Sequence, residues 1–72
     1  MEDIIGTERV EKGILLHVRT SNGIKDVLFE FRELIDMKVN ALHLLQSPHK
    51  YLCSIESHRI TRRGKNHEDA VR

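Results

Sequence analysis

The stretch SHRITRRGKNH, residues 57–67, carries four of the twelve Lys and Arg side chains of this 72-residue chain and no acidic one. If Ile60 points inward on a strand, alternation places Arg59 and Arg63 together on the opposite face. A row of cations can bind phosphates without reading base sequence. The stretch therefore predicts a candidate nucleic-acid surface made by Arg59, Arg62, Arg63 and Lys65.

Two features weaken that interpretation. No aromatic residue lies between these cations, although aromatic stacking is typical of proteins that bind single strands or RNA. Charged side chains on an edge strand also have a simpler role, because they prevent edge-to-edge aggregation. Nucleic-acid binding is therefore an alternative function, and it is not the favoured one.

The other reactive side chains do not form a recognisable catalytic or metal-binding motif. Cys53 is the single cysteine, and its alternation with its neighbours is typical of a buried, unreactive thiol. No two of the five histidines have the i, i+4 spacing of helical metal ligands. The glycines are scattered and form no phosphate-binding loop. We therefore expect a protein that is not an enzyme and that uses neither a metal nor a cofactor.

The length allows one domain, expected over residues 1–64, with a flexible tail over residues 65–72. A core of this size contributes only about 3 to 5 kcal/mol, and a lone cysteine cannot form an internal disulfide. A second subunit is the most economical additional support, so we expect a homodimer. The lone thiol and the acidic start, which resembles no signal peptide, predict a cytoplasmic protein without a membrane segment.

Charge is distributed unevenly along the chain. Residues 1–36 carry eight acidic and five basic side chains, and residues 37–72 carry three and seven, so the halves have charges of −3 and +4. The net charge is +1. Such a chain can present one basic surface or dock onto a copy of itself, or both ends can simply be solvated.

The first half of the chain has the alternation of β-strands. Ile14, Leu16 and Val18 alternate with Leu15, His17 and Arg19. Ser21-Asn22-Gly23 follows as a hairpin turn, in which Asn-Gly supplies positive φ angles. A strand over residues 24–30 comes next. An earlier strand is expected around residues 4–10.

The period then changes to that of a helix. Residues 31–46 form an amphipathic pattern whose apolar arc is wider than one small sheet can cover, and Ser47-Pro48 ends it. The surplus apolar face is expected to meet a second subunit. An alternative is that the C-terminal segment folds over the same face. The predicted interface residues are Met37, Ala41, Leu44 and Leu45.

A further strand begins near residue 50, where Tyr51, Cys53 and Ile55 alternate with Leu52, Ser54 and Glu56. It can continue as a fifth short strand through residues 58–62 after a bulge or tight turn near Ser57. The predicted fold class is α+β: a small antiparallel sheet of order β-β-β-α-β, with a fifth short strand as an option and one amphipathic helix packed on it.

Residues 3–36 resemble the opening of a small bacterial family called domain of unknown function 2442. The similarity rests on Asn22-Gly23 at the hairpin, Leu34-Ile35 at the helix start, and the segment LLQSPHKY over residues 44–51. ITRRG, residues 60–64, replaces the Trp-Pro-Asn-Gly ending of that family. The resemblance implies a small α+β domain and no catalytic residues.

These observations together predict a small non-enzymatic protein-binding or regulatory module that self-associates. The alternative is a nucleic-acid-binding regulator that uses residues 57–67.

Overall fold

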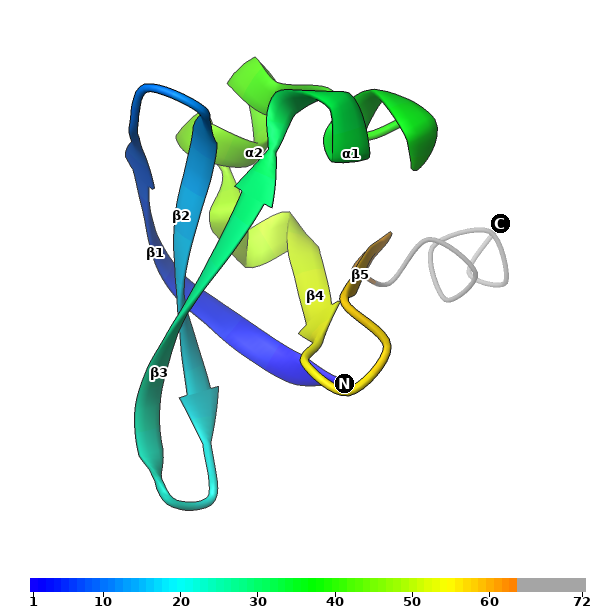
Figure 1. The fold of residues 1–72 in the computed structure, drawn as a ribbon. Helices are drawn as coiled ribbons and strands as arrows, with labels where there is room; N and C mark the ends of the chain where they lie inside the picture. The colour runs from blue at the N-terminus through cyan, green and yellow to red at the C-terminus, as the bar shows by residue number, and fades with distance from the viewer. Residues whose placement is uncertain (64–72) are drawn as a thin grey trace, which may run out of the picture.

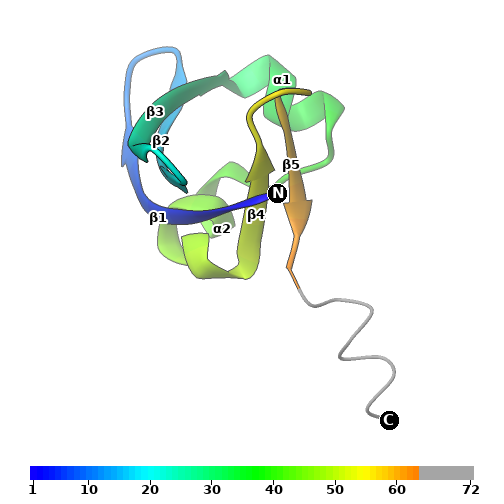
Figure 2. The same cartoon turned by 90° about the horizontal axis from the view of Figure 1, so that it is seen from below.

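The computed structural model describes residues 1–63 and has an α+β fold, as the sequence predicts. Five strands form one antiparallel sheet of order β3-β2-β1-β4-β5. Two short helices lie toward one end of the molecule in Figure 1, and Figure 2 shows that they are separated from each other. The predicted tail, residues 65–72, lies outside the described residues. The elements are β1 (Glu2–Arg9), β2 (Gly13–Thr20), β3 (Gly23–Glu30), α1 (Phe31–Asp36), α2 (Ala41–Gln46), the 3-10 helix η1 (Pro48–Lys50), β4 (Tyr51–Ser54) and β5 (Arg59–Arg62).

The β2–β3 hairpin forms where the sequence predicts it. Its strands pair over eight positions, from Gly13 opposite Glu30 to Thr20 opposite Gly23. Gly23 has a φ of +119°, which a residue without Cβ adopts at little cost. Asn22 does not take the expected positive φ. Its backbone N–H instead donates to the Thr20 hydroxyl at 3.1 Å, so the threonine side chain holds the turn.

Strand β1 connects two parts of the sheet. Its first residues, Glu2 and Asp3, pair with β4, and the rest of the strand pairs with β2. The register shifts between Ile4 and Gly6, which marks a bulge. A bulge bends a strand and increases its twist. The sheet consequently curls around its core, with β2 and β3 on one side and β4 and β5 on the other (Figure 2).

The prediction of one continuous helix over residues 31–46 was wrong. Helix α1 ends at a Schellman motif, in which the Lys38 N–H donates to the Ile35 carbonyl and the Val39 N–H donates to the Leu34 carbonyl. Lys38 takes a left-handed φ of 61° at the position where glycine is usual. Asn40 then caps α2, because its side chain accepts a hydrogen bond from the His43 N–H at 3.0 Å.

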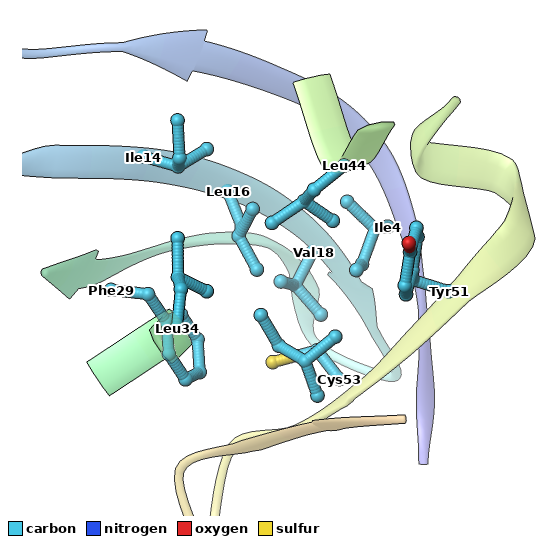
Figure 3. Close-up of a cluster of buried hydrophobic side chains, with 10 residues drawn as sticks. Ile4, Ile14, Leu16, Val18, Phe29, Leu34, Leu44, Tyr51 and Cys53 are labelled. Carbon is cyan, nitrogen blue, oxygen red and sulfur yellow. The ribbon is translucent and has the colours of Figure 1, made fainter. Parts of the chain in front are cut away.

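The core lies between the curled sheet and the helices (Figure 3). Each helix contributes one fully buried side chain, Leu34 from α1 and Leu44 from α2. Tyr51 and Cys53 of β4 and Ile60 of β5 face inward as predicted. The buried hydrophobic residues are Ile4, Ile14, Leu16, Val18, Phe29, Leu34, Leu44, Tyr51, Cys53 and Ile60. Within residues 1–63, neither helix has the length and apolar character needed to cross a membrane.

Candidate interaction surfaces

The helical face differs from the one that the sequence predicts. Leu44 is 0% exposed and packs inside the core of its own chain, so it presents no side-chain surface to a partner (Figure 3). Met37, Ala41 and Leu45 are half-buried and pack against the same core. The break after α1 places Ile35 and Leu42 outward instead, with 72% and 63% of their surfaces exposed.

Helix α2 is held against the sheet by two side-chain contacts. The Thr7 hydroxyl of β1 donates to the Leu45 carbonyl at 3.1 Å. His43 is half-buried, and its Nδ1 lies 2.6 Å from the Tyr51 hydroxyl of β4. The two rings also meet edge to face, with centroids 5.5 Å apart. The exposed Leu42 therefore sits on a helix whose position is set by these contacts.

The four cations of the candidate nucleic-acid surface do not form a free row. Arg63 pairs with the Asp3 carboxylate, and its Nε donates to the His49 carbonyl at 2.9 Å. The Arg62 guanidinium lies over the Tyr51 ring, 5.9 Å from its centroid, within the range of a cation–π contact. Arg59 is exposed on β5. Lys65 lies outside the described residues.

Arg63 therefore has a structural role that the sequence pattern does not reveal. Its backbone N–H donates to the Lys50 carbonyl at 2.7 Å, and its side chain reaches the start of β1. These contacts close the sheet at the β4–β5 end. Asp3 is 60 positions away in the sequence, so no local pattern predicts the ion pair.

His58 and Glu33 form a second link between distant parts of the chain. His58 Nε2 lies 3.2 Å from the Glu33 carboxylate, and the imidazole stacks on Phe29. Glu33 also accepts a hydrogen bond from the Glu30 N–H at 2.8 Å, as part of the capping box of α1. This backbone hydrogen bond lowers the pKa of Glu33 below its ordinary value of 4.5, and His58 lowers it further. Desolvation of the carboxylate raises the pKa, but by less.

Cys53 is fully buried, as its alternation predicts. Burial raises the pKa of its thiol from 9.0 to about 11, and the negative charge of Glu2 adds to the shift. A thiol with a raised pKa is a poor nucleophile at neutral pH, because the thiolate is the reactive form. This chemistry agrees with a core role for Cys53.

The pockets found on the described surface are not lined by a group of side chains that could act together in catalysis. An open hollow of about 320 Å³ at the base of α1 is lined by Lys12, Glu30, Phe31 and Arg32. Among residues 1–63, no group of three or more His, Cys, Asp or Glu side chains has the arrangement of a metal site. The surface features that remain are the exposed apolar helix residues, the basic β5 and the outer edge of the sheet.

The outer edge of the sheet is a feature that the sequence reasoning missed. Strand β3 ends the sheet on one side, and the β2–β3 hairpin projects from the body of the molecule (Figure 1). Ile24 and Leu28 are 64% and 39% exposed on this strand, with Asp26 between them. The alternation of these three residues was a usable signal, but nothing local indicates that β3 is an edge strand.

Comparisons with protein-family models, curated proteins and solved structures find no match to this chain. Its proposed function therefore depends on the surfaces described above.

Proposed function

We propose that this chain is a small non-enzymatic protein-binding or regulatory module that self-associates as a homodimer through its helical face. The observation that carries the proposal is the exposure of Ile35 and Leu42, the two most exposed large aliphatic side chains of the described helices. Burying an aliphatic side chain of this size contributes about 1.5 to 3 kcal/mol. A chain with only about 3 to 5 kcal/mol from its own core gains substantially from such burial.

The proposed contact surface consists of Ile35 and Leu42 with the half-buried Met37, Ala41 and Leu45 beside them in the sequence. Leu44 belongs to the core and supports this surface from within. Its inclusion among the interface residues followed from treating residues 31–46 as one helix.

Three histidines take part in contacts that hold the fold together. His17, His43 and His58 each lie within hydrogen-bond distance of a side chain on another element, namely Asp26, Tyr51 and Glu33 respectively. Each of these pairs joins two elements of the fold. The single cysteine, which is free and buried, fits a protein of the reducing cytoplasm.

Sedimentation equilibrium of the full chain from low to high micromolar concentration tests self-association. We expect a dimer for the native chain. The double variant Ile35→Glu, Leu42→Glu should be a monomer with an unchanged circular dichroism spectrum, since both side chains are exposed. A native chain that remains a monomer at high micromolar concentration would exclude the dimer.

Matched variants separate the surface from the core. Leu44→Ala should lower the free energy of unfolding by about 2 to 5 kcal/mol, because it removes a fully buried side chain. In contrast, Leu42→Ala should weaken the dimer, and it should change the stability of the monomer by less than about 0.5 kcal/mol.

The alternative proposal is a nucleic-acid-binding regulator. Its support is the exposure of Arg59 and Arg62 on β5, the second edge strand of the sheet. The pairing of Arg63 with Asp3 reduces the positive charge that this surface offers to phosphates. Self-association is therefore the function that the geometry supports better.

A further inference from the structure

Among residues 1–63, no strand pairs with the outer edge of β3, which therefore presents a defined set of backbone groups. The Phe31 N–H donates to the Lys12 carbonyl at 3.0 Å, which fixes the alternation of hydrogen bonds between β2 and β3. It follows that residues 25, 27 and 29 direct their N–H and C=O groups toward β2. Ile24, Asp26 and Leu28 direct theirs toward the free edge. The Glu30 N–H is already used by the Glu33 carboxylate.

The side chains beside this edge form a charged pair between two apolar positions. On the outer face of the sheet, Ile24, Asp26 and Leu28 alternate along β3. His17 Nδ1 of β2 lies 2.7 Å from the Asp26 carboxylate, which has further acceptor sites free. Lys25 is exposed on the other face, opposite the buried Val18. An added strand therefore meets a negative charge and a positive charge at adjacent positions.

A second copy of this chain pairs poorly with the edge in the register that matches their apolar residues. In an antiparallel pair related by a two-fold axis, directly opposite residues lie on the same face. The register that places Ile24 opposite Leu28 of the second copy also places the two Asp26 carboxylates opposite each other. The two Lys25 side chains become diagonal neighbours on the other face. Like charges at such positions destabilise strand pairing.

We propose that the free edge of β3 binds an extended segment of another protein as an added antiparallel strand. The segment has the order apolar, any residue, basic, acidic, apolar. Its basic residue lies opposite Asp26, its acidic residue lies opposite Lys25, and its two apolar residues cover Leu28 and Ile24. Main-chain hydrogen bonds supply affinity and the alternating side chains supply selectivity. The inference rests on the proposed protein-binding function and names the class of partner.

The test uses two capped peptides of equal composition with the full chain. One contains Val-Thr-Lys-Glu-Val, and the other contains Val-Thr-Glu-Lys-Val. Titration into ¹⁵N-labelled protein should shift the amide signals of Ile24, Asp26 and Leu28 most strongly with the first peptide. In the second peptide, Glu lies opposite Asp26 and Lys lies opposite Lys25, so both attractive charge pairs become repulsive. Its binding should therefore be weaker by roughly tenfold.

A charge-exchanged protein is the decisive control. The double variant Lys25→Asp, Asp26→Lys should prefer the second peptide, and its amide spectrum away from β3 and the neighbouring β2 should stay that of the native protein, since Asp26 contacts His17 of β2. No binding of the first peptide at millimolar concentration would overturn the inference. It would also be overturned by shifts centred on another element, or by an unchanged preference in the double variant.

Self-pairing and dimerisation give separate outcomes. Concentration-dependent shifts of the β3 amides without peptide would identify a second copy as the occupant and overturn the inference. A protein that dimerises through Ile35 and Leu42 but binds neither peptide would overturn the inference and leave self-association intact. A protein that stays a monomer and binds the first peptide would exclude self-association and support the peptide inference.

Discussion

The imidazole ring of His58 stacks on the ring of Phe29, with centroids 4.0 Å apart and an interplanar angle of 19°. Phe29 belongs to the buried core, whereas His58 lies in the turn between β4 and β5 with a positive φ of 55°. Such a backbone conformation is costly for a residue with a side chain and persists where surrounding contacts fix it. His58 has those contacts with Phe29 of β3 and Glu33 of α1, and through them it joins the β4–β5 hairpin to both elements.

Glu33→Gln should reduce the acid sensitivity of the fold. The pKa of Glu33 is lowered in the folded state, so its contribution to stability is present above about pH 4.5 and is lost as pH falls through the folded value. Urea unfolding between pH 6 and pH 3 should give a flatter dependence for the variant. Glu56→Gln, which changes an exposed glutamate in the β4–β5 turn, should keep the native dependence. Parallel curves for all three proteins would contradict this role of Glu33.

Cys53 should react slowly with a thiol reagent in the native protein and rapidly in denaturant. The side chain is fully buried, and its raised pKa keeps it as the thiol at neutral pH. The protonated Cys53 thiol contributes to the stability of the fold below pH 9. This contribution is lost as pH rises toward about 11, because the thiol of the unfolded chain loses its proton at a lower pH than the thiol of the folded protein. Cys53→Ala should lower the free energy of unfolding by about 1 kcal/mol and remove this alkaline decline. Native labelling as fast as that of a small free thiol would show that the core assignment is wrong.

Lys38→Gly should stabilise the protein. Lys38 occupies the left-handed position of the Schellman motif, which costs a residue with Cβ roughly 1 to 2 kcal/mol. Glycine removes this cost but loses more conformational entropy on folding, so the expected gain is about 0.5 kcal/mol. Lys38→Val, which introduces a β-branched side chain at the same φ, should destabilise the protein. Thermal unfolding of the three proteins orders them, and a native protein more stable than both variants would refute the argument.

The strands were predictable because each depends on a short local pattern. Ile14, Leu16 and Val18 alternate over one strand, and Asn22-Gly23 marks the turn that follows. The same reasoning places Cys53 in the core. In such segments the side-chain period of two assigns each residue to a face without knowledge of the remaining chain.

The helical region was not predictable by the same reasoning. Apolar residues continue across the break, so a helical wheel drawn over residues 31–46 assumes one phase where the structure has two. Asn40 is a strong capping residue and was the available sign of a second helix start. A single wheel therefore predicts Leu44 as a contact residue for a second subunit, whereas in the structure Leu44 is buried in the core and Leu42 is exposed.

The candidate sites depend on contacts between distant residues, which local patterns do not contain. Arg63 resembles Arg59 in the sequence, yet only Arg63 meets Asp3 at the far end of the chain. The free edge of β3 follows from the strand order, which the sequence does not state. Composition and spacing supplied the candidate cations, and tertiary packing decides which of them is available.

The last prediction concerns residues 57–67. If Arg59, Arg62 and Arg63 bind nucleic acid, affinity for a DNA or RNA duplex should fall steeply with salt, since each neutralised phosphate releases counterions. Their joint replacement by Ala should then abolish binding, with the salt slope reduced by about three.

We expect the other outcome, because Arg63 is paired with Asp3 and Arg62 lies over Tyr51. The triple variant should keep its fold, since an exposed ion pair contributes at most about 1 kcal/mol. It should aggregate more readily, because it removes cations from the edge strand β5. Arg59→Ala alone is the matched control, and it should leave the Asp3 pair and the stability unchanged. Fluorescence anisotropy with labelled DNA and RNA and light scattering of the same samples separate the two outcomes. Sub-micromolar binding at physiological salt that is lost in the triple variant would establish the nucleic-acid function instead.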